Sequence, residues 1–288
     1  MKVAFVTGSN KGIGKAIVSK LAGTLQTTGR WDIYLTARNV ERGRQACADL
    51  AKHGLDVKFH QLDITDKNSR QRFLEFINSH YPTGINVAVN NAGIAYIDDS
   101  TVPFSEQARL TMQTNFFDTL TFTEEFIPFL APDARVVHLS SLLGHNALRK
   151  LSPLLYDKFT SPLTMVELRS LAIDFVRHAQ IGEHERRGWP STAYGVSKLC
   201  LTKASYILGE QLRNDPRNIV MNSCCPGYVD TDMTHHKGSK TPEQGADTPF
   251  YLATLPLGIT EPINEFVSER RIRAWGRAGK VARVKGPQ

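Results

Sequence analysis

Tyr194 and Lys198 are the pair of residues in this sequence best suited to proton transfer. They lie four positions apart, so on a helix both side chains project from the same face. A tyrosine hydroxyl can give a proton to an oxygen that gains negative charge, but its ordinary pKa of about 10 is too high for easy two-way transfer at neutral pH. A neighbouring ammonium favours the tyrosinate and lowers that pKa. The spacing therefore predicts acid–base chemistry at a carbonyl or alcohol oxygen.

Ser140, Ser141 and Asn115 could complete such a site. The two serines follow an apolar run, and a hydroxyl at the carboxyl end of a strand can hydrogen-bond a substrate oxygen. Asn115 is expected to hold a water that connects Lys198 to solvent for proton supply. Each residue has a structural alternative, because a serine after a strand often caps a helix and an asparagine can bond to the backbone. Only the combination of these residues indicates catalysis.

A glycine-rich turn at residues 7–14 (TGSNKGIG) follows the first apolar run and precedes an amphipathic helix. Glycines let the backbone turn tightly and approach a pyrophosphate, which then lies at the positive end of the helix. A Walker-type nucleotide site does not fit, because Gly14-Lys15 comes six positions after Gly8 and precedes Ala16 instead of Ser or Thr. The turn indicates a dinucleotide cofactor, although a plain strand-to-helix turn can carry the same glycines.

The end of the second apolar run distinguishes between the two nicotinamide cofactors. NAD-binding sites usually place Asp or Glu there, whereas this chain has Arg38, with Asp32 at the opposite end of the run. Arg38, Arg42 and Lys11 can together surround a 2′-phosphate, which favours NADP(H). The alternative is that both arginines are solvated residues at a helix start.

Taken in order, these pieces resemble the short-chain dehydrogenase/reductase family, from residue 3 to about residue 233. The resemblance also rests on residues 90–93 (NNAG) and 194–198 (YGVSK). It is greatest to the monomeric NADPH-dependent carbonyl reductases, because of residues 114–117 (TNFF), 188–191 (GWPS) and 224–227 (CCPG). The resemblance implies four catalytic residues, with Ser141 preferred to Ser140 because the family's serine is the second of that pair. The four are Asn115, Ser141, Tyr194 and Lys198.

The resemblance also implies which residues contact NADPH/NADP+. Asp63 is expected near the adenine, Asn90 near the adenosine-side ribose, Lys198 on the nicotinamide ribose, and Val229 and Thr231 at the carboxamide. The full expected set is Gly8, Asn10, Lys11, Gly12, Ile13, Gly14, Arg38, Arg42, Asp63, Ile64, Asn90, Tyr194, Lys198, Pro226, Gly227, Val229 and Thr231. Residues 234–241 are polar and suit a mobile substrate lid. Tyr96 and Ile97 stand where some carbonyl reductases carry a cation, which puts recognition of glutathione conjugates in doubt.

Alternating apolar runs and amphipathic stretches predict the elements that position these residues. Strands are expected at 3–7, 33–37, 57–61, 87–90, 135–139, 218–224 and 264–267, and helices at 13–26, 40–53, 67–80, 105–130, 164–180, 192–213 and 242–254. Repeated strand–helix units predict an α/β fold: one doubly wound Rossmann-type domain with a mostly parallel sheet of about seven strands flanked by helices.

The expected domain covers residues 1–267, with an insertion at about 145–190 before the tyrosine helix. In tetramers of this family the helices that hold Asn115 and Tyr194 form the main interface, so an insertion beside them predicts a monomer. Residues 268–288 carry seven Lys or Arg and one Glu, a net charge of +6 of the chain's +7. This composition predicts a solvated, mobile tail, with a membrane-surface or nucleic-acid contact as the alternative.

The remaining composition excludes several classes of protein. No apolar run is long enough for a membrane span, and we expect no secretory signal. The four cysteines are too few for a disulfide scaffold and match no zinc pattern, and His235-His236 lies in no metal motif, so we expect no metal and a reducing, cytoplasmic location. No nucleic-acid partner is expected.

The sequence thus predicts an enzyme that reduces aldehydes, ketones or quinones to alcohols with NADPH, with Tyr194 as proton donor. The first alternative is an NADP-dependent dehydrogenase of a specific secondary alcohol, such as a hydroxysteroid or a prostaglandin. The second, of another class, is an NADP(H)-sensing binding protein.

Overall fold

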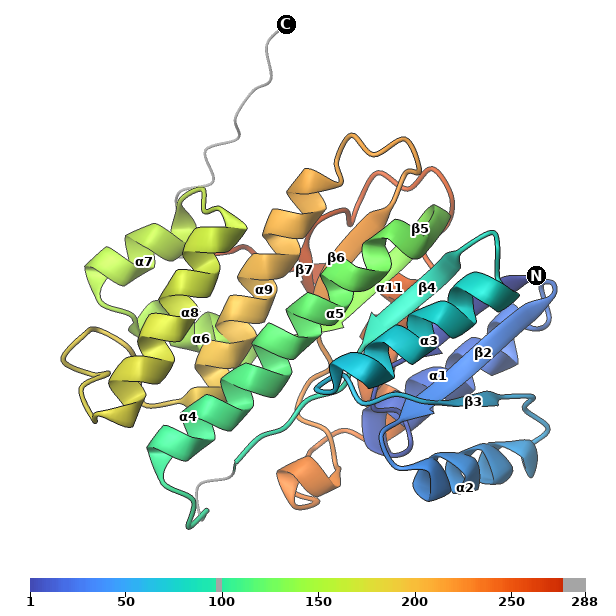
Figure 1. Cartoon of the computed structure of the whole chain (residues 1–288), viewed down its shortest axis with the longest axis horizontal. Coiled ribbons are helices and arrows are strands. Elements are labelled where there is room, and N and C mark those ends of the chain that lie inside the picture. The colour runs from blue at the N-terminus through green and yellow to red at the C-terminus, as the bar shows by residue number, and fades with distance from the viewer. Residues whose placement is uncertain (97–99, 277–288) are drawn as a thin grey trace, which may run out of the picture.

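The computed structural model describes residues 1–96 and 100–276, and these form an eight-stranded sheet with helices on both faces (Figure 1). The strand order is β3-β2-β1-β4-β5-β6-β7-β8. Every neighbouring pair is parallel except β7 and β8, which run antiparallel. The predicted doubly wound, mostly parallel α/β sheet is confirmed.

The strands match the predicted apolar runs closely, and β8 is an addition. They are β1 (Lys2–Val6), β2 (Trp31–Ala37), β3 (Lys58–Gln61), β4 (Ile85–Asn90), β5 (Leu130–Leu139), β6 (Val220–Cys225), β7 (Phe266–Ser268) and β8 (Arg271–Ile272). Four of the five residues of β1 and all six of β6 are buried, as expected for central strands covered on both faces.

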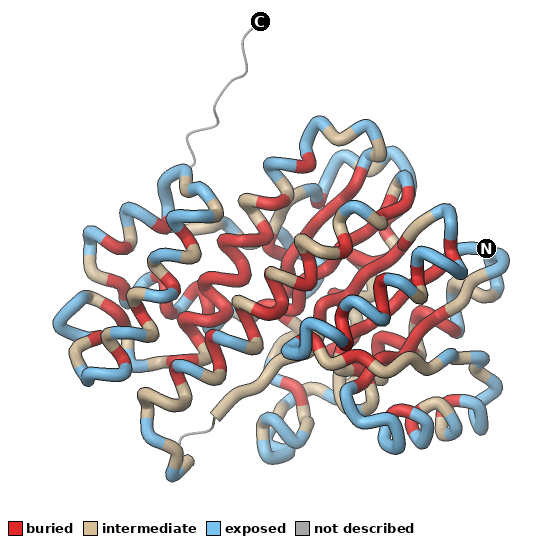
Figure 2. The backbone as a smooth tube through the Cα atoms, viewed as in Figure 1, coloured by how far each residue is buried: buried red, intermediate tan, exposed pale blue. Residues whose placement is uncertain are grey.

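The helices between these strands divide into two layers. They are α1 (Gly12–Leu25), α2 (Val40–Ala51), α3 (Lys67–His80), α4 (Phe104–Met112), η1 (Gln113–Asp118), α5 (Thr119–Phe126), η2 (Ile127–Phe129), α9 (Ala193–Gln211), η3 (Asp232–Thr234), α10 (Pro242–Gly245) and α11 (Asp247–Ala253). One layer buries α3, α4, α5 and α9 against the sheet, and the other buries α1, α2 and α11. The buried residues in Figure 2 therefore follow the strands and the inward sides of the helices. None of the helices in the described residues is long and apolar enough to cross a membrane.

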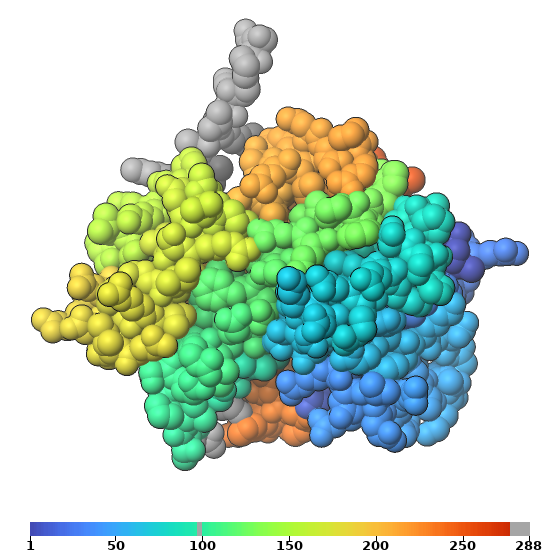
Figure 3. All heavy atoms as spheres, in the orientation of Figure 1, coloured from blue at the N-terminus to red at the C-terminus, as the bar shows by residue number. Residues whose placement is uncertain are grey.

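The predicted helix at 105–130 is interrupted by η1, a turn of π-helix between α4 and α5. The insertion contains the predicted helix α8 (Met165–Gln180) and two helices that the sequence analysis missed, α6 (Leu142–Lys150) and α7 (Pro153–Thr160). The signal for α7 was Ser152-Pro153, because the Ser152 hydroxyl caps the helix and proline occupies its first position. The insertion lies directly against α4 and α9 (Figures 1 and 3).

The expected start of a mobile tail at residue 268 is wrong for residues 268–276. Arg271 pairs in β8 with Ser268 of β7, and Arg270 forms two hydrogen bonds with the Asp247 carboxylate. The Trp275 indole donates to the Phe159 carbonyl at 3.0 Å, which fixes the segment on the insertion. The rest of the predicted basic tail, residues 277–288, lies outside the described residues.

Candidate active site

The four predicted catalytic residues come from three elements that meet at the carboxyl edge of the sheet. Ser141 follows β5, Tyr194 and Lys198 lie in the first turns of α9, and Asn115 lies in η1. Ser141 hydrogen-bonds with Tyr194, and the Lys198 ammonium lies 5.5 Å from the centroid of the Tyr194 ring. A Cβ placed on Gly93 would lie 3.0 Å from Asn115 Oδ1 and 3.7 Å from Lys198 Nζ, so Asn115 and Lys198 flank the same point.

Lys198 is almost completely buried, with 5% of its surface exposed. Its Nζ donates to the Leu139 carbonyl at 2.7 Å, at the end of β5. Burial lowers the pKa of Lys198 to about 8 because the charged form loses its hydration. The ammonium is held beside the tyrosine, yet only one of its hydrogen atoms has an acceptor in the described residues.

We expected Lys198 to lower the pKa of Tyr194, and burial of the phenol opposes that effect by raising the pKa. The hydrogen bond with Ser141 offsets the effect of burial only in part. The Lys198 ammonium lies over the ring and bonds to the Leu139 carbonyl, not to the phenol oxygen. Because the ordinary pKa of tyrosine is about 10, the phenol is a proton donor at neutral pH with or without these effects.

The two neighbouring serines have different surroundings. Ser140 is buried, and its hydroxyl bonds to the Lys198 carbonyl at 3.0 Å and to the Thr202 hydroxyl at 2.5 Å, which ties β5 to α9. Ser141 is partly exposed, and its hydroxyl accepts from the Leu143 amide at 3.1 Å as the cap of α6. A hydroxyl that accepts from an amide can still donate to another oxygen. Ser141 is thus the serine that can contact a substrate.

Asn115 is fully buried, and its side chain is already occupied. Its Oδ1 accepts from the Ile94 amide at 2.8 Å, and its Nδ2 donates to the Ile94 carbonyl at 2.8 Å and to the Ser197 hydroxyl at 3.1 Å. The side chain therefore clamps the segment after β4, which leaves only one lone pair of Oδ1 for another partner. In a π-turn the carbonyl of residue i bonds to the amide of residue i+5. Where such a turn interrupts an α-helix, one backbone carbonyl is left without an amide partner. The water expected at Asn115 would therefore bind to this backbone carbonyl in η1.

The glycine turn has the backbone shape that close approach to a phosphate requires. Gly8 and Gly12 have φ values of +60° and +55°, and a Cβ on Gly14 would lie 2.5 Å from the Asn91 Nδ2. No side chain caps the amino end of α1, and no acidic residue lies in its first turn. Its free amides and helix dipole suit an anion.

Sequence analysis assigned no role to Thr7 or Asn91, which support this turn. The Thr7 hydroxyl accepts from the Asn91 and Ala92 amides at 3.0 Å, and Asn91 Nδ2 donates to the Thr7 and Gly8 carbonyls at 2.8 and 3.0 Å. The signal was their place in the motifs, one before the glycines and one in NNAG. The two residues join the cofactor turn to the segment that Asn115 clamps.

The three predicted cations do not share one environment. Arg38 and Arg42 are exposed and form no ion pair within residues 1–96 and 100–276, whereas Lys11 is paired with Asp232. A cavity of about 350 Å³ between the glycine turn and α2 is lined by Asn10, Glu41, Arg42, Gln45, Ala46 and Asp49. Asn10 of the glycine turn and Arg42 of α2, both predicted to contact the cofactor, therefore line the same cavity.

The residues expected around the adenosine differ in how they are exposed. Asp63 is partly exposed, and its Oδ1 accepts from the Thr65 amide and hydroxyl. Asn90 is buried, with its amide bonded to the Thr123 hydroxyl at 2.9 Å and to His138 Nδ1 at 3.2 Å. The Asn90 side chain therefore faces the interior, and any ribose contact would have to come from its backbone.

The loop after β6 returns towards the glycine turn. Gly227 has a φ of +95°, and Val229 is buried against Gly238 and Gly245. The Thr231 methyl carbon lies 3.2 Å from the position of a Cβ on Gly12. Thr231 thus lies beside the glycine turn, and Val229 packs inside the loop after β6.

Large apolar side chains are exposed around this edge of the sheet. They are Leu142, Leu143, Tyr228 and Met233, which follow Ser141 or lie in the loop after β6. Exposed apolar groups near a polar catalytic centre suit an apolar ligand. Ile97, whose position was expected to border this rim, lies outside the described residues.

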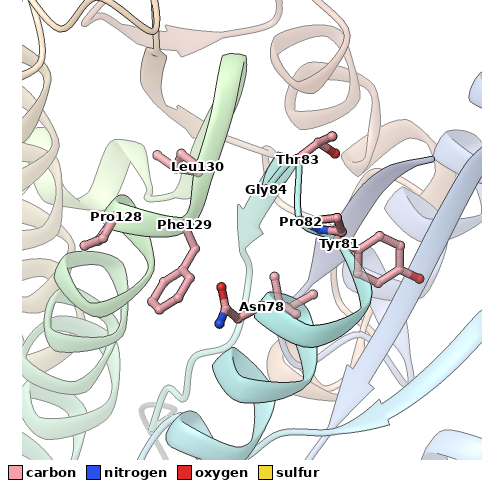
Figure 4. A pocket seen from close by; sticks show the side chains of 9 residues that line it. Asn78, Tyr81, Pro82, Thr83, Gly84, Pro128, Phe129 and Leu130 are labelled. Atoms are coloured by element: carbon pink, nitrogen blue, oxygen red, sulfur yellow. The ribbon is translucent and has the colours of Figure 1, made fainter.

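A second cavity, of about 150 Å³, lies at the opposite edge of the sheet (Figure 4). It is lined by the end of α3, the starts of β4 and β5 and the chain between, among them Asn78, Tyr81, Thr83 and Phe129. The predicted catalytic residues lie at the carboxyl edge of the sheet, so this cavity is not part of their site. Within the described residues, no group of three His, Cys, Asp or Glu side chains could hold a metal ion.

Comparison with known proteins agrees with this geometry. The model of the short chain dehydrogenase family matches residues 2–153. Carbonyl reductase [NADPH] 1 of Homo sapiens is 45% identical over 278 residues, 95% of this chain and 98% of the relative. Carbonyl reductase [NADPH] 3 of Mus musculus is 45% identical over 277 residues, with the same coverage. Among solved structures, salutaridine reductase from Papaver somniferum has a TM-score of 0.81 at 27% identity, covering 92% of this chain and 99% of that one.

Proposed function

Because this chain belongs to the short-chain dehydrogenase family, we propose that it reduces aldehydes, ketones or quinones to alcohols with NADPH. The observation that carries the proposal is the position of the Tyr194 phenol beside Ser141 and Lys198 at the carboxyl edge of the sheet. Relatives named as carbonyl reductases [NADPH], about 45% identical over nearly the whole chain, support the same substrate class and cofactor.

The residues around the glycine turn fit NADPH. The uncapped amino end of α1 and the tight turn at Gly8 and Gly12 suit the pyrophosphate, and Arg38, Arg42 and Lys11 suit the 2′-phosphate. Ile13, Ile64, Pro226, Gly227, Val229 and Thr231 would complete the binding surface. When bound, NADPH supplies the hydride that the carbonyl carbon receives.

The catalytic residues of the chain each have one proposed part in the reaction. The Ser141 hydroxyl and the Tyr194 phenol donate to the substrate oxygen and orient it. Tyr194 then transfers its proton as negative charge develops on that oxygen. The Lys198 ammonium stabilises the resulting tyrosinate and holds the nicotinamide ribose, and the η1 backbone beside Asn115 holds the water that returns the proton.

The relatives named as carbonyl reductases [NADPH] favour reduction over an NADP-dependent dehydrogenase of hydroxysteroids or prostaglandins. A protein that only sensed NADP(H) would not need Ser141, Tyr194 and Lys198 together. Reduction is therefore the direction that we propose.

We also propose that the chain is a monomer whose described residues, through residue 276, form one domain. The insertion packs against α4 and α9, the helices that form the main interface in tetramers of the family. A cytoplasmic location is supported by the four cysteines, none of which is paired. Light scattering at micromolar concentration should give about 32 kDa, and two or four times that mass would contradict the monomer.

The test of the function is NADPH oxidation over a panel of quinones, aromatic aldehydes and ketosteroids. We expect turnover of several members, and a loss of about a thousandfold or more in kcat for Tyr194→Phe, with NADPH binding retained. Faster oxidation of hydroxysteroids with NADP+ would favour the dehydrogenase. Tight NADPH binding with no turnover that depends on Tyr194 would favour the sensor.

A further inference from the structure

Four ionisable side chains join the loop after β6 to the glycine turn. Asp232 Oδ2 is bonded to Lys11 Nζ, and Asp232 Oδ1 lies 3.2 Å from His236 Nε2. His236 Nδ1 lies 2.7 Å from Asp230 Oδ1. Lys11, Asp232, His236 and Asp230 thus form one chain of contacts, which we call the charge chain.

The charge chain spans the place where the cofactor phosphates are proposed to bind. Lys11 directly precedes α1, and Asp232 opens η3. The neighbouring Thr231 touches the glycine turn, with its methyl carbon 3.2 Å from the Cβ position of Gly12. The contact between Lys11 and Asp232 is therefore one of the links between the loop and the glycine turn.

Lys11 is also one of the three cations proposed for the 2′-phosphate, and the only one of them that is paired in the described residues. A phosphate dianion carries more charge than the Asp232 carboxylate, and Arg38 and Arg42 can bind it from other sides. Lys11 can reach another partner because a lysine is a point charge on a flexible stem. The Asp232 carboxylate and the 2′-phosphate can thus both pair with the Lys11 ammonium, one at a time.

We infer that Asp232 competes with the 2′-phosphate for Lys11, so that NADPH, unlike NADH, frees the loop after β6. This inference rests on the proposed function, because it assumes that NADPH binds at the glycine turn. Asp232 can release Lys11 at small cost, since its carboxylate is 59% exposed and its Oδ1 keeps His236. The loop that is released carries Val229 and Thr231, and also the exposed apolar residues Tyr228 and Met233. Exchange of Asp232 for the 2′-phosphate at Lys11 would therefore also affect the residues that border the substrate.

The experiment measures the affinity of the whole chain for NADPH by calorimetry, and for NADH by competition. Asp232→Asn should tighten NADPH binding about two- to fivefold, the worth of one exposed ion pair, and leave NADH unchanged. In a Lys11→Met background, Asp232→Asn should change neither affinity. His236→Gln should weaken NADPH binding up to about twofold, because Asp232 then depends more on Lys11. Weaker NADPH binding in Asp232→Asn, or an equal change for NADH, would overturn the exchange.

Hydrogen exchange of residues 230–237 gives a second readout that does not depend on turnover. In the natural chain these amides should exchange faster with NADPH than with NADH bound, and in Asp232→Asn they should exchange fast with both. Equal exchange with both nucleotides in the natural chain would overturn the inference. A chain that turns over carbonyls with NADPH yet shows no effect of Asp232→Asn would overturn only the inference, whereas a chain that binds no NADPH would overturn the proposed function as well.

Discussion

Helix α9 carries two buried lysines, Lys198 and Lys203, that look alike by every local measure. They are 5% and 8% exposed, and each donates to one backbone carbonyl, Leu139 at 2.7 Å and Ser161 at 2.8 Å. Burial lowers the pKa of each to about 8. A lowered pKa alone therefore does not show which of the two lysines belongs to a catalytic site.

What separates the two lysines is the region of the helix in which each lies. Lys198 lies over the Tyr194 ring at the carboxyl edge of the sheet, where ligands of such folds bind. Lys203 lies about one turn further on, at the carboxyl end of α7, where a positive charge complements the helix dipole. A lowered lysine pKa therefore reports burial, and only the neighbouring groups show whether the charge takes part in chemistry.

The largest expected effect separates the lysines by activity. Lys198→Met should lower kcat about a hundred- to ten-thousandfold, because the charge opposite the developing tyrosinate is lost. The matched variant Lys203→Met should stay within about twofold of the natural enzyme. Steady-state rates at saturating NADPH, with circular dichroism to establish folding, measure both. Comparable losses in the two variants would show that the comparison is wrong.

The adjacent serines extend the comparison from α9 to the end of β5. Ser141→Ala should lower kcat about a hundredfold, as expected for one donor to the substrate oxygen. Ser140→Ala should instead lower the free energy of unfolding by about 1–3 kcal/mol, because it leaves buried partners in α9 unpaired, and should largely keep kcat. Urea unfolding and steady-state kinetics on both variants test this, and an exchange of the two outcomes would contradict the preference for Ser141.

The pH dependence of reduction should report Lys198 and not Lys203. Reduction needs the Tyr194 phenol protonated, which its raised pKa ensures, and the Lys198 ammonium, which is lost as pH rises through about 8. We expect kcat/KM to be flat below that pH and to fall up to about tenfold per unit above it. Lys203→Met should keep this profile. Lys198→Arg should have lower activity but no fall near pH 8, and a fall that persists would assign it to another group.

The sequence was sufficient for the sheet and for the residues at its carboxyl edge, because apolar periodicity and the Tyr194–Lys198 spacing are local patterns. It could not show that burial raises the pKa of Tyr194, since the degree of burial depends on packing between distant elements. Spacing alone also could not show that Asn115 turns its side chain to Ile94. In residues 268–276 the charges concealed Trp275, whose hydrogen-bond partner Phe159 lies more than a hundred positions earlier in the chain.

The smallest expected effect concerns the stability that each buried charge costs. Because the folded pKa of Lys203, about 8, lies below its ordinary value of 10.5, the unfolded chain binds more protons between these pH values. The contribution of Lys203 to the free energy of unfolding therefore rises as pH increases from about 8 to 10.5. Lys203→Met should raise the free energy of unfolding by about 1–2 kcal/mol at pH 7, and the gain should shrink by pH 10.

Lys203→Gln is the matched control, since it keeps a donor for the Ser161 carbonyl and removes only the charge. Ser161 is exposed, so water can replace the lysine as donor, and the loss of this hydrogen bond should cost little. Met and Gln should therefore both stabilise the chain at pH 7, as measured by urea unfolding at several pH values. If Met destabilises the chain while Gln does not, the hydrogen bond to α7 outweighs the buried charge, and Lys203 would be a structural anchor whose low pKa has no net cost.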